Sequence, residues 1–292
     1  MDYFLTIATL ILIFIILNQS YNLVIGYTGM VHLGHVAFMA IGAYTSAILT
    51  TAYGMPFWFG LVSGIILAAL AGLLLGIPTV RFRDDYLVAA TLGMGEIIKI
   101  ILINERQFTG GSTGIPAIAP PDFFGLVLKN NFYLFIFTLV ITVIIMLFVW
   151  RLTHSPFGKT LEAVREDETA AKSLGKNTNL IRLQILIIAA AIAGFSGVLY
   201  AHTIQFIDPN AFDVHRMIFV LLQVVFGGSG TFWGPVVGTT ILFTTFESMR
   251  FLPLPPHIMG PMRWIIYSMI LILIIIFKPT GIMGKKLVRK RL

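Results

Sequence analysis

Apolar residues gather along the chain in long runs, and short polar connectors separate the runs. A run of about 20 apolar residues matches, as a helix, the thickness of the hydrocarbon core of a membrane. We predict nine helical spans, at about residues 3–25, 31–53, 57–80, 86–103, 131–150, 183–203, 214–227, 232–249 and 262–278. The predicted fold class is therefore an all-α, polytopic membrane bundle, with one transmembrane domain over residues 1–292.

The number of spans is open between eight and ten. Glycines interrupt the segments 31–53 and 214–232, so either segment could be broken or re-entrant. Non-helical backbone at membrane depth has to be shielded by protein or to line a wet cavity. The first apolar stretch lacks a basic leader and a small-residue cleavage site, so we expect a retained first span.

The one long polar segment covers residues 151–182 and lies between two strongly apolar runs. Ser155-Pro156 predicts a helix start, and Gly175 predicts its end. At helical spacing Ala163, Val164, Ala170, Ala171 and Leu174 share one arc, with Asp167 in its middle. This shallow arc predicts a helix that docks against another protein. A solvated helix that only satisfies the topology is the alternative.

Composition supports the membrane reading. The 292 residues are 57% hydrophobic and 11% charged, with a mean hydropathy of +0.90. The net charge of +7 does not indicate nucleic-acid binding, because the basic residues lie between and after the spans. Most Lys and Arg residues fall in the connector 81–85, in segment 151–182 and in the basic tail 279–292.

The positive-inside rule therefore places these three segments in the cytoplasm, with the N-terminus outside and the C-terminus inside. Two loops are then expected outside. They are the glycine-rich loop 104–130 and the proline-rich loop 250–261.

Candidate chemistry is sparse, and it argues against an enzyme. The chain has no cysteine, which excludes disulfides and thiolate metal sites. His32 and His35 lack a third ligand nearby, so we expect hydrogen-bonded structural roles and no metal site. Glu96 and Lys99 could form a relay, but a mutually neutralising pair is simpler.

Nucleotide binding by this chain is also not predicted. The run Gly227-Gly228-Ser229-Gly230 lacks the Gly-Lys-Ser/Thr ending that holds a nucleotide. The turns at Gly26–Gly29 and Gly227–Gly230 weakly suggest an internal repeat. No set of residues predicts a catalytic constellation.

Several motifs, in order, resemble those of permease subunits of branched-chain amino acid ABC importers, especially the LivM type. The resemblance covers nearly the whole chain, and its residues are 22–29, 33–35, 38, 42–44, 109–115, 155–159, 162–168, 171, 173–175, 193–194, 197, 227–231, 234–235 and 238. The segment 151–182 resembles the EAA loop of that family, although Val164 departs from the broader pattern after Glu162-Ala163.

The resemblance implies an inner-membrane subunit that transports without hydrolysing ATP itself. Segment 151–182 then supplies the coupling helix, and the implied contacts with the ATPase are Glu162, Ala163, Arg165, Asp167, Ala171, Leu174 and Gly175. The residues expected along the translocation path are Gly29, Gly34, His35, Phe38, Gly42 and Tyr44. The residues expected to face a binding protein are Thr109, Gly110, Gly111, Ser112 and Gly114.

The implied partners are a homologous permease of the LivH type, two ATP-binding subunits and an extracytoplasmic binding protein. ATP and Mg²⁺ belong to the ATP-binding subunits, and no cofactor is expected in this chain. The implied substrates are Leu, Ile and Val. Urea, short-chain amides or other amino acids remain alternatives, as does a stand-alone secondary transporter.

Overall fold

The computed structural model describes residues 2–82, 84–123, 126–128 and 130–249, and beyond these 262, 265–266, 268–270, 272–273, 276–278 and 280–284. The helices are α1 (Asp2–Thr28), α2 (His35–Thr51), α3 (Phe57–Thr79), α4 (Asp84–Asn104), α5 (Arg106–Thr109), α6 (Asn131–Thr153), α7 (Pro156–Glu166), α8 (Glu168–Ser173), α9 (Thr178–Ile204), α10 (Val214–Gly227) and α11 (Gly234–Ser248). Short elements are the 3-10 helices η1 (Gly111–Thr113) and η2 (Pro209–Phe212), and the strands β1 (Ile115–Pro116), β2 (Asp122–Phe123), β3 (Leu126–Val127) and β4 (Phe206–Ile207).

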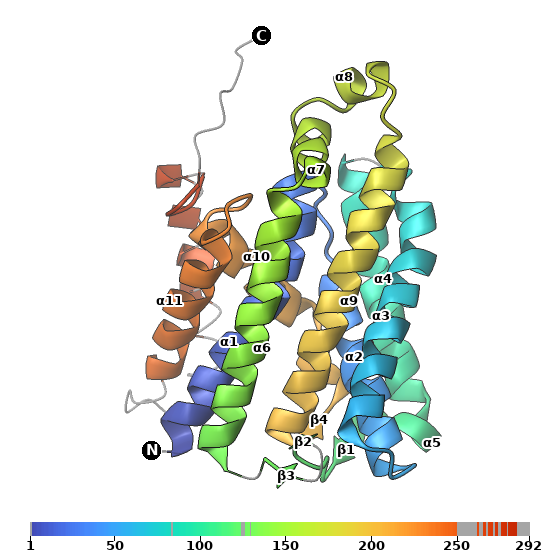
Figure 1. Cartoon of the computed structure of the whole chain (residues 1–292), viewed down its shortest axis with the longest axis vertical. Helices are drawn as coiled ribbons and strands as arrows, with labels where there is room; N and C mark the ends of the chain where they lie inside the picture. Colours follow the sequence, from blue (N-terminus) through green and yellow to red (C-terminus); the bar gives the residue numbers. More distant parts are fainter. Residues whose placement is uncertain are drawn as a thin grey trace.

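The long helices lie side by side, as Figure 1 shows. Helices α7 and α8 project at one end, called here the α8 end. The N-terminus and the small strands lie at the opposite end, called here the strand end. Two antiparallel strand pairs form there, β1 with β4 and β2 with β3. The described chain is thus a helical bundle with two structurally different ends.

Helix α9 is the centre of the bundle, where it packs against α2, α3 and α1. Its neighbour α3 carries a small residue at every fourth position, which places these residues on one stripe: Gly60, Gly64, Ala68, Gly72 and Gly76. A methyl group on Gly42 of α2 would overlap the backbone of Gly194 in α9. Small residues therefore let the helix backbones touch, as is common in membrane bundles.

Helices α10 and α11 pack against each other and against α1. A buried polar contact joins these three helices. The Asn18 Nδ2 atom donates to Gln223 Oε1 at 2.5 Å and to Thr239 Oγ1 at 2.6 Å. Interhelical hydrogen bonds of this kind join helices where lipid supplies no competing partner.

Both glycine-interrupted segments contain non-helical backbone, at residues 31–34 before α2 and at residues 228–232 between α10 and α11. Helix α2 begins only at His35, and residues 29–34 run without helix between it and α1. The Leu33 N–H group in this stretch donates to Thr91 Oγ1 at 3.0 Å. In the second stretch, the Gly230 N–H group donates to Asn22 Oδ1 at 2.8 Å. Protein therefore supplies partners for this backbone.

Eight of the nine predicted spans coincide with a described helix, and the ninth, 262–278, falls only partly on described residues. Six described helices are long and apolar enough to cross a membrane, and α2 is a shorter apolar helix. The six are α1, α3, α4, α6, α9 and η2 with α10. The predicted loop 250–261 and the tail from residue 285 lie outside the described residues.

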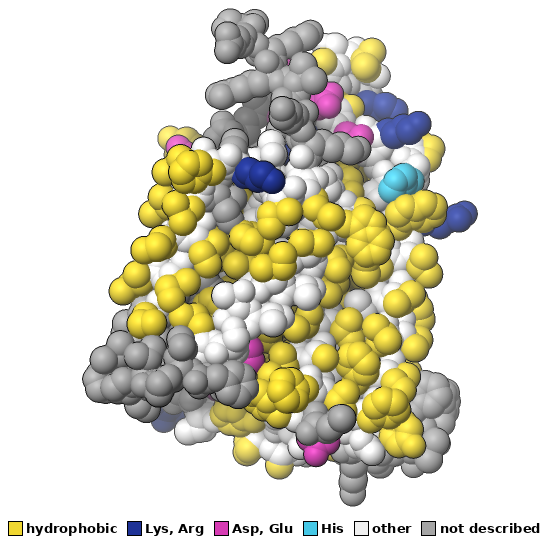
Figure 2. All heavy atoms as spheres, turned by 90° about the vertical axis from the view of Figure 1, so that its left-hand side faces the viewer, with side chains coloured by type: hydrophobic (Ala, Val, Ile, Leu, Met, Phe, Trp, Pro, Cys, Tyr) yellow, Lys and Arg dark blue, Asp and Glu magenta, His cyan; other side chains and the backbone are white. Residues whose placement is uncertain are grey.

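The surface agrees with a membrane position. Figure 2 shows hydrophobic side chains over the middle of the face that carries α11. Most of the Lys and Arg side chains visible in this view lie toward the α8 end. An apolar middle with charge toward one end is the distribution that a bilayer requires.

Candidate functional site

The polar segment at the α8 end consists of two short helices, not one. Ser155 begins α7, where its Oγ accepts from Gly158 N at 3.3 Å and Pro156 takes the first position. Asp167 then adopts extended backbone, with φ −155° and ψ 102°. Its Oδ1 accepts from Thr169 N at 2.8 Å and Ala170 N at 2.9 Å, which caps α8. The single helix predicted from Ser155 to Gly175 is therefore wrong.

The break changes which residues face outward, so the predicted single arc is also wrong. Val164 of α7 and Ala171 of α8 are buried against the protein itself, with 2% and 3% exposure. Ala163 and Ala170 are exposed, and Leu174 is 81% exposed. A residue in extended conformation resets the helical phase, which a constant spacing of 100° per residue cannot anticipate. The predicted end at Gly175 is correct, because that residue takes φ +76° after α8.

Arg165 on α7 reaches into the bundle and joins three parts of the chain. Its Nη1 donates to the carbonyl oxygen of Gly26 near the end of α1. Its aliphatic part passes Gly29, and its guanidinium lies against Gly230 in the turn between α10 and α11. We call Asn22, Gly26, Gly29, Arg165 and Gly230 the Arg165 junction.

Asn22 holds the other side of this junction. Its Nδ2 donates to the Thr231 carbonyl at 2.9 Å, and its Oδ1 accepts from Gly230 N at 2.8 Å. A methyl group on Gly26 would overlap both the Gly230 nitrogen and the Asn22 side chain. The two glycine turns that resemble a repeat in sequence are therefore in direct contact in space. The sequence reasoning named Arg165 but missed Asn22.

Helix α8 is attached to α9 by charged groups. The Glu168 carboxylate binds Arg182 Nη2 at 3.1 Å and Lys172 Nζ at 2.8 Å. Thr178 Oγ1 also donates to Glu168 Oε1, at 3.1 Å. Glu168 and Arg182 are only about one-sixth exposed, so solvent screens their interaction less than a surface pair. Helix α7 is thus fixed to α1, and α8 to α9.

The glycine-rich loop at the strand end is largely an internal scaffold. Thr109 is buried, and its Oγ1 donates to the carbonyls of Leu102 and Glu105, each at 2.6 Å. Gly111 and Gly114 are also buried, and Gly110 is partly buried. Ser112 is exposed. Of the residues predicted to face a binding protein, Ser112 is therefore the one with an exposed side chain.

The residues predicted along the translocation path divide into two groups. Gly29 and Gly34 border clefts. The others are packed inside the bundle: His35, Phe38, Gly42 and Tyr44. His35 Nε2 lies 2.8 Å from Ser20 Oγ, in keeping with the structural role predicted for it.

Two ionisable residues that were not among the predicted site residues border the cleft at Gly34. They are Glu96 of α4 and Asp213, which caps α10 by accepting from Arg216 N at 3.0 Å. Among the described residues no ion pair joins Glu96 to Lys99, so the expected mutual neutralisation is not seen. A carboxylate just before a broken membrane helix was the signal that could have identified Asp213.

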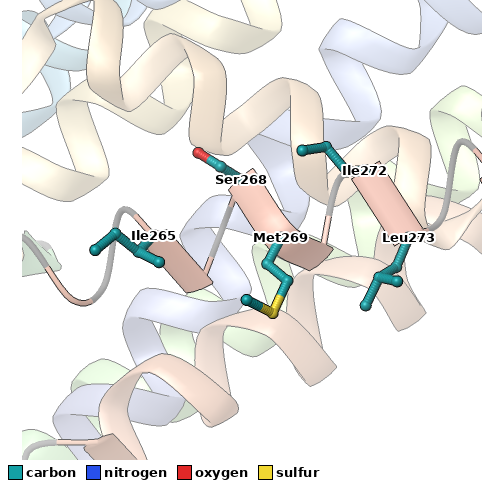
Figure 3. Close-up of a pocket in the computed structure, with 5 residues that line it drawn as sticks. All are labelled: Ile265, Ser268, Met269, Ile272 and Leu273. Atoms are coloured by element: carbon teal, nitrogen blue, oxygen red, sulfur yellow. The ribbon is translucent and has the colours of Figure 1, made fainter.

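A separate hollow lies on the bundle surface near the end of the chain. Figure 3 shows its lining, Ile265, Ser268, Met269, Ile272 and Leu273. The four apolar residues are 46–61% exposed. None of these five described residues is charged. The lining resembles a lipid-facing surface.

The long apolar helices, with buried polar contacts between them and charged residues gathered toward one end, indicate a multi-pass integral membrane protein. The chain belongs to the family of branched-chain amino acid transport system permease components, whose model matches residues 3–277.

Relatives of this family include proteins with different cargoes in their names. The high-affinity branched-chain amino acid transport permease LivM of Escherichia coli is 39% identical over 267 residues, 84% of this chain and 63% of LivM. The chain thus spans less than two thirds of that relative. LivH of Salmonella typhimurium is 28% identical over 93% of this chain and 91% of LivH.

The autoinducer 2 import permease LsrC of Salmonella paratyphi B is 25% identical over 82% of this chain and 70% of LsrC. No solved structure matches the chain.

Proposed function

We propose that the chain is the transmembrane permease subunit of an ATP-driven ABC importer for branched-chain amino acids. The family match and the 39% identity to LivM support this function. The observation that carries it is the α7–α8 segment. This polar pair of short helices projects from the bundle. On its inner side, a hydrogen bond joins it to α1 and a salt bridge joins it to α9.

The proposed topology has nine membrane spans. Its N-terminus lies outside the cell and its C-terminus lies in the cytoplasm. Ile282 N and Met283 N donate to the carbonyls of Phe226 and Gly227, so the last described residues lie beside the α10–α11 turn. At the strand end, Tyr3 OH donates to Glu247 Oε1 at 2.6 Å. The basic residues of 151–182 support a cytoplasmic α8 end. The membrane is the cytoplasmic membrane of a bacterium or archaeon.

The proposed assembly contains this chain, a LivH-type permease, two ATP-binding subunits and an extracytoplasmic binding protein. ATP and Mg²⁺ bind the ATP-binding subunits. Their closure displaces α7 and α8, and the attachments to α1 and α9 carry the displacement into the bundle. The bundle then opens alternately to the two sides, and hydrolysis resets it.

The surface proposed to contact the ATPase is the exposed side of this segment. It comprises Glu162, Ala163, Glu166, Ala170 and Leu174. Ala163 and Ala170 let a partner approach closely, and Leu174 supplies an apolar anchor. Arg165 and Ala171 face the bundle, so their proposed part in coupling is to transmit movement rather than to touch the partner. Asp167 and Gly175 shape the two ends of α8.

Co-purification in detergent with candidate ATP-binding subunits tests this surface. We expect the wild-type chain to capture its ATPase, and the variants Ala163→Trp and Leu174→Asp to lose it. Ser112→Trp, on an exposed site at the strand end, is the matched control and keeps capture. Ala171→Trp is unsuitable because Ala171 is buried. Equal capture by all variants would exclude the α7–α8 surface as the contact.

Substrate identity is tested by uptake into proteoliposomes that contain the purified complex and its binding protein. We expect ATP-dependent uptake of labelled leucine that isoleucine and valine compete and that urea and acetamide do not. Competition by urea or acetamide would show that the protein is an importer of urea or short-chain amides. Uptake driven by an ion gradient without ATP would instead identify a secondary transporter.

A further inference from the structure

Two clefts lie along one side of the bundle, where residues 29–37 meet α4. The first, of about 420 Å³, is at the α8 end and is bordered by Gly29, Val31, Val88, Glu168 and Arg182. The second lies further from the α8 end and is bordered by Gly34, Leu92, Gly95, Glu96, Asp213 and Met217. Its volume of about 10 Å³ is room for about one water molecule, so the cleft is closed to an amino acid in this conformation. The non-helical residues 29–34 and α4 border both clefts, and we call this strip of the bundle, with its two separate clefts, the track.

The track has the non-helical backbone of residues 29–34 on one side and helix α4, which is largely exposed, on the other. Leu33 N donates to Thr91 Oγ1, which fixes the non-helical stretch against α4 between the clefts. Helix α4 is the least covered of the six long apolar helices. Non-helical backbone at membrane depth survives where it is buried in protein or lines a wet cavity. Here it borders the clefts.

The second cleft places charged groups near the middle of the bilayer. Glu96 lies 12 residues into α4, or about 18 Å from the α8 end of that helix at 1.5 Å per residue. Lys99 lies three residues further along α4, and the Asp213 carboxylate also pairs with His215 Nδ1 at 2.8 Å. Glu96, Lys99 and Asp213 are all partly buried. Ionisable groups at this depth are costly, and they characteristically mark a solute or ion pathway.

Buried polar atoms also lie behind the wall of this cleft. His32 is 3% exposed, and within the described part of the chain neither of its ring nitrogens has a hydrogen-bond partner. Its Cε1 is 3.3 Å from the position that a side chain on Gly34 would take. Gly34, which has no side chain, thus lies between the His32 ring and the cleft.

We propose that this track is this chain's half of the translocation path and that Glu96, Lys99 and Asp213 contact the substrate backbone. The inference rests on the proposed function, because its ligand is a zwitterionic α-amino acid. The carboxylates of Glu96 and Asp213 face its ammonium group, and the Lys99 ammonium faces its carboxylate. Leu92 and Met217 supply apolar surface for its side chain. The second permease covers the open side of the track.

Charge-neutral variants in the reconstituted full transporter test the substrate contacts. The variants are Glu96→Gln, Lys99→Met and Asp213→Asn, and asparagine still caps α10 at position 213. We expect leucine uptake to fall about tenfold in each, as loss of a charge-assisted contact predicts, while the binding protein still stimulates the ATPase. Glu247→Gln, near the strand end of α11, is the control and keeps wild-type uptake.

Wild-type uptake in all three variants would overturn the proposed contacts. A wild-type complex that imports no amino acid would instead refute the proposed function, so the two failures are distinguishable.

Introduced cysteines test the track independently, because the chain has no cysteine of its own. A side chain at Gly95 would lie 3.4 Å from Gly34 Cα in the cleft, and one at Gly93 would meet nothing within 4 Å in this chain. We expect a membrane-impermeant thiol reagent to label Gly95→Cys and not Gly93→Cys, and nucleotide to change the labelling rate. Equal labelling of both, or no labelling of Gly95→Cys in any nucleotide state, would overturn the track.

Discussion

Replacing Arg165 by methionine removes the guanidinium and keeps the aliphatic part of the side chain that passes Gly29. The hydrogen bond to the Gly26 carbonyl is then lost. A hydrogen bond from a charged donor contributes about 1.5–3 kcal/mol to stability. Since about 1.4 kcal/mol corresponds to a factor of ten, the state in which α7 is detached from α1 should gain about 10- to 150-fold in population.

The expected consequence is loss of coupling rather than loss of ATPase assembly. The outer face of α7 is unchanged, so the ATP-binding subunits still bind, but their movement reaches α1 less effectively. The assay is the number of ATP molecules hydrolysed per leucine imported into proteoliposomes. We expect this ratio to rise several-fold for Arg165→Met and to stay at the wild-type value for Arg151→Met, which removes a positive charge at an exposed site of α6, outside the proposed contact surface.

A folded Arg165→Met complex with a wild-type ratio would refute the reasoning, because the junction would then carry no coupling energy. Thermal unfolding in detergent shows whether the variant is folded. An Arg151→Met ratio that rises equally would show that any lost positive charge near the α8 end raises the ratio, and it would refute a specific role for the bond to Gly26.

Three further predictions concern stability, each measured by unfolding of the purified chain in detergent. Asn22→Leu leaves Gly230 N and the Thr231 carbonyl without their side-chain partner and should cost about 2–4 kcal/mol, whereas Asn179→Leu at an exposed site should change little; equal losses would contradict the junction. Gly42→Ala forces a methyl group into the Gly194 backbone and should cost about 1–3 kcal/mol. Gly93→Ala meets nothing within 4 Å in this chain and should be neutral or stabilising by up to about 1 kcal/mol, so the same sign for both alanine variants would be inconsistent with the helix contact. Asp167→Ala removes the cap of α8 and should cost about 0.5–2 kcal/mol; Asp167→Asn should retain most of that stability, and a similar loss in both would argue against the cap.

Local signals in the sequence were sufficient for the long apolar helices, but not for the α7–α8 break or for the contacts between helices. Apolar runs place α1, α3, α4, α6 and α9, because transfer into a bilayer depends on composition over one helix length. Asp167 shows the limit of such signals. Aspartate is both a tolerable helix residue and a strong N-cap, and the constant periodicity assumed for 163–174 hid the second possibility.

The candidate site was predictable only in part because its contacts join distant residues. Arg165 contacts Gly26 across 139 positions, and Asn22 contacts Gly230 across 208. Neither pairing has a local pattern. The weak similarity between the two glycine turns was a real hint, since these turns meet in space. Charge alone identified Glu96 as unusual, but only the fold brings it to the same cleft as Asp213.

Because α7 and α8 are attached to different helices, a displacement of the α8 end would act on the bundle at two separate points. In the proposed mechanism, Arg165 transmits the displacement to α1 and Glu168 transmits it to α9, and these two helices pack against each other. If both short helices travel together, α1 and α9 move as one body. If the Asp167 joint bends, α1 and α9 slide past each other. The backbone stiffness at Asp167 would thus decide between two movements. In one, α1 and α9 rotate together as a rigid body; in the other, they slide along each other.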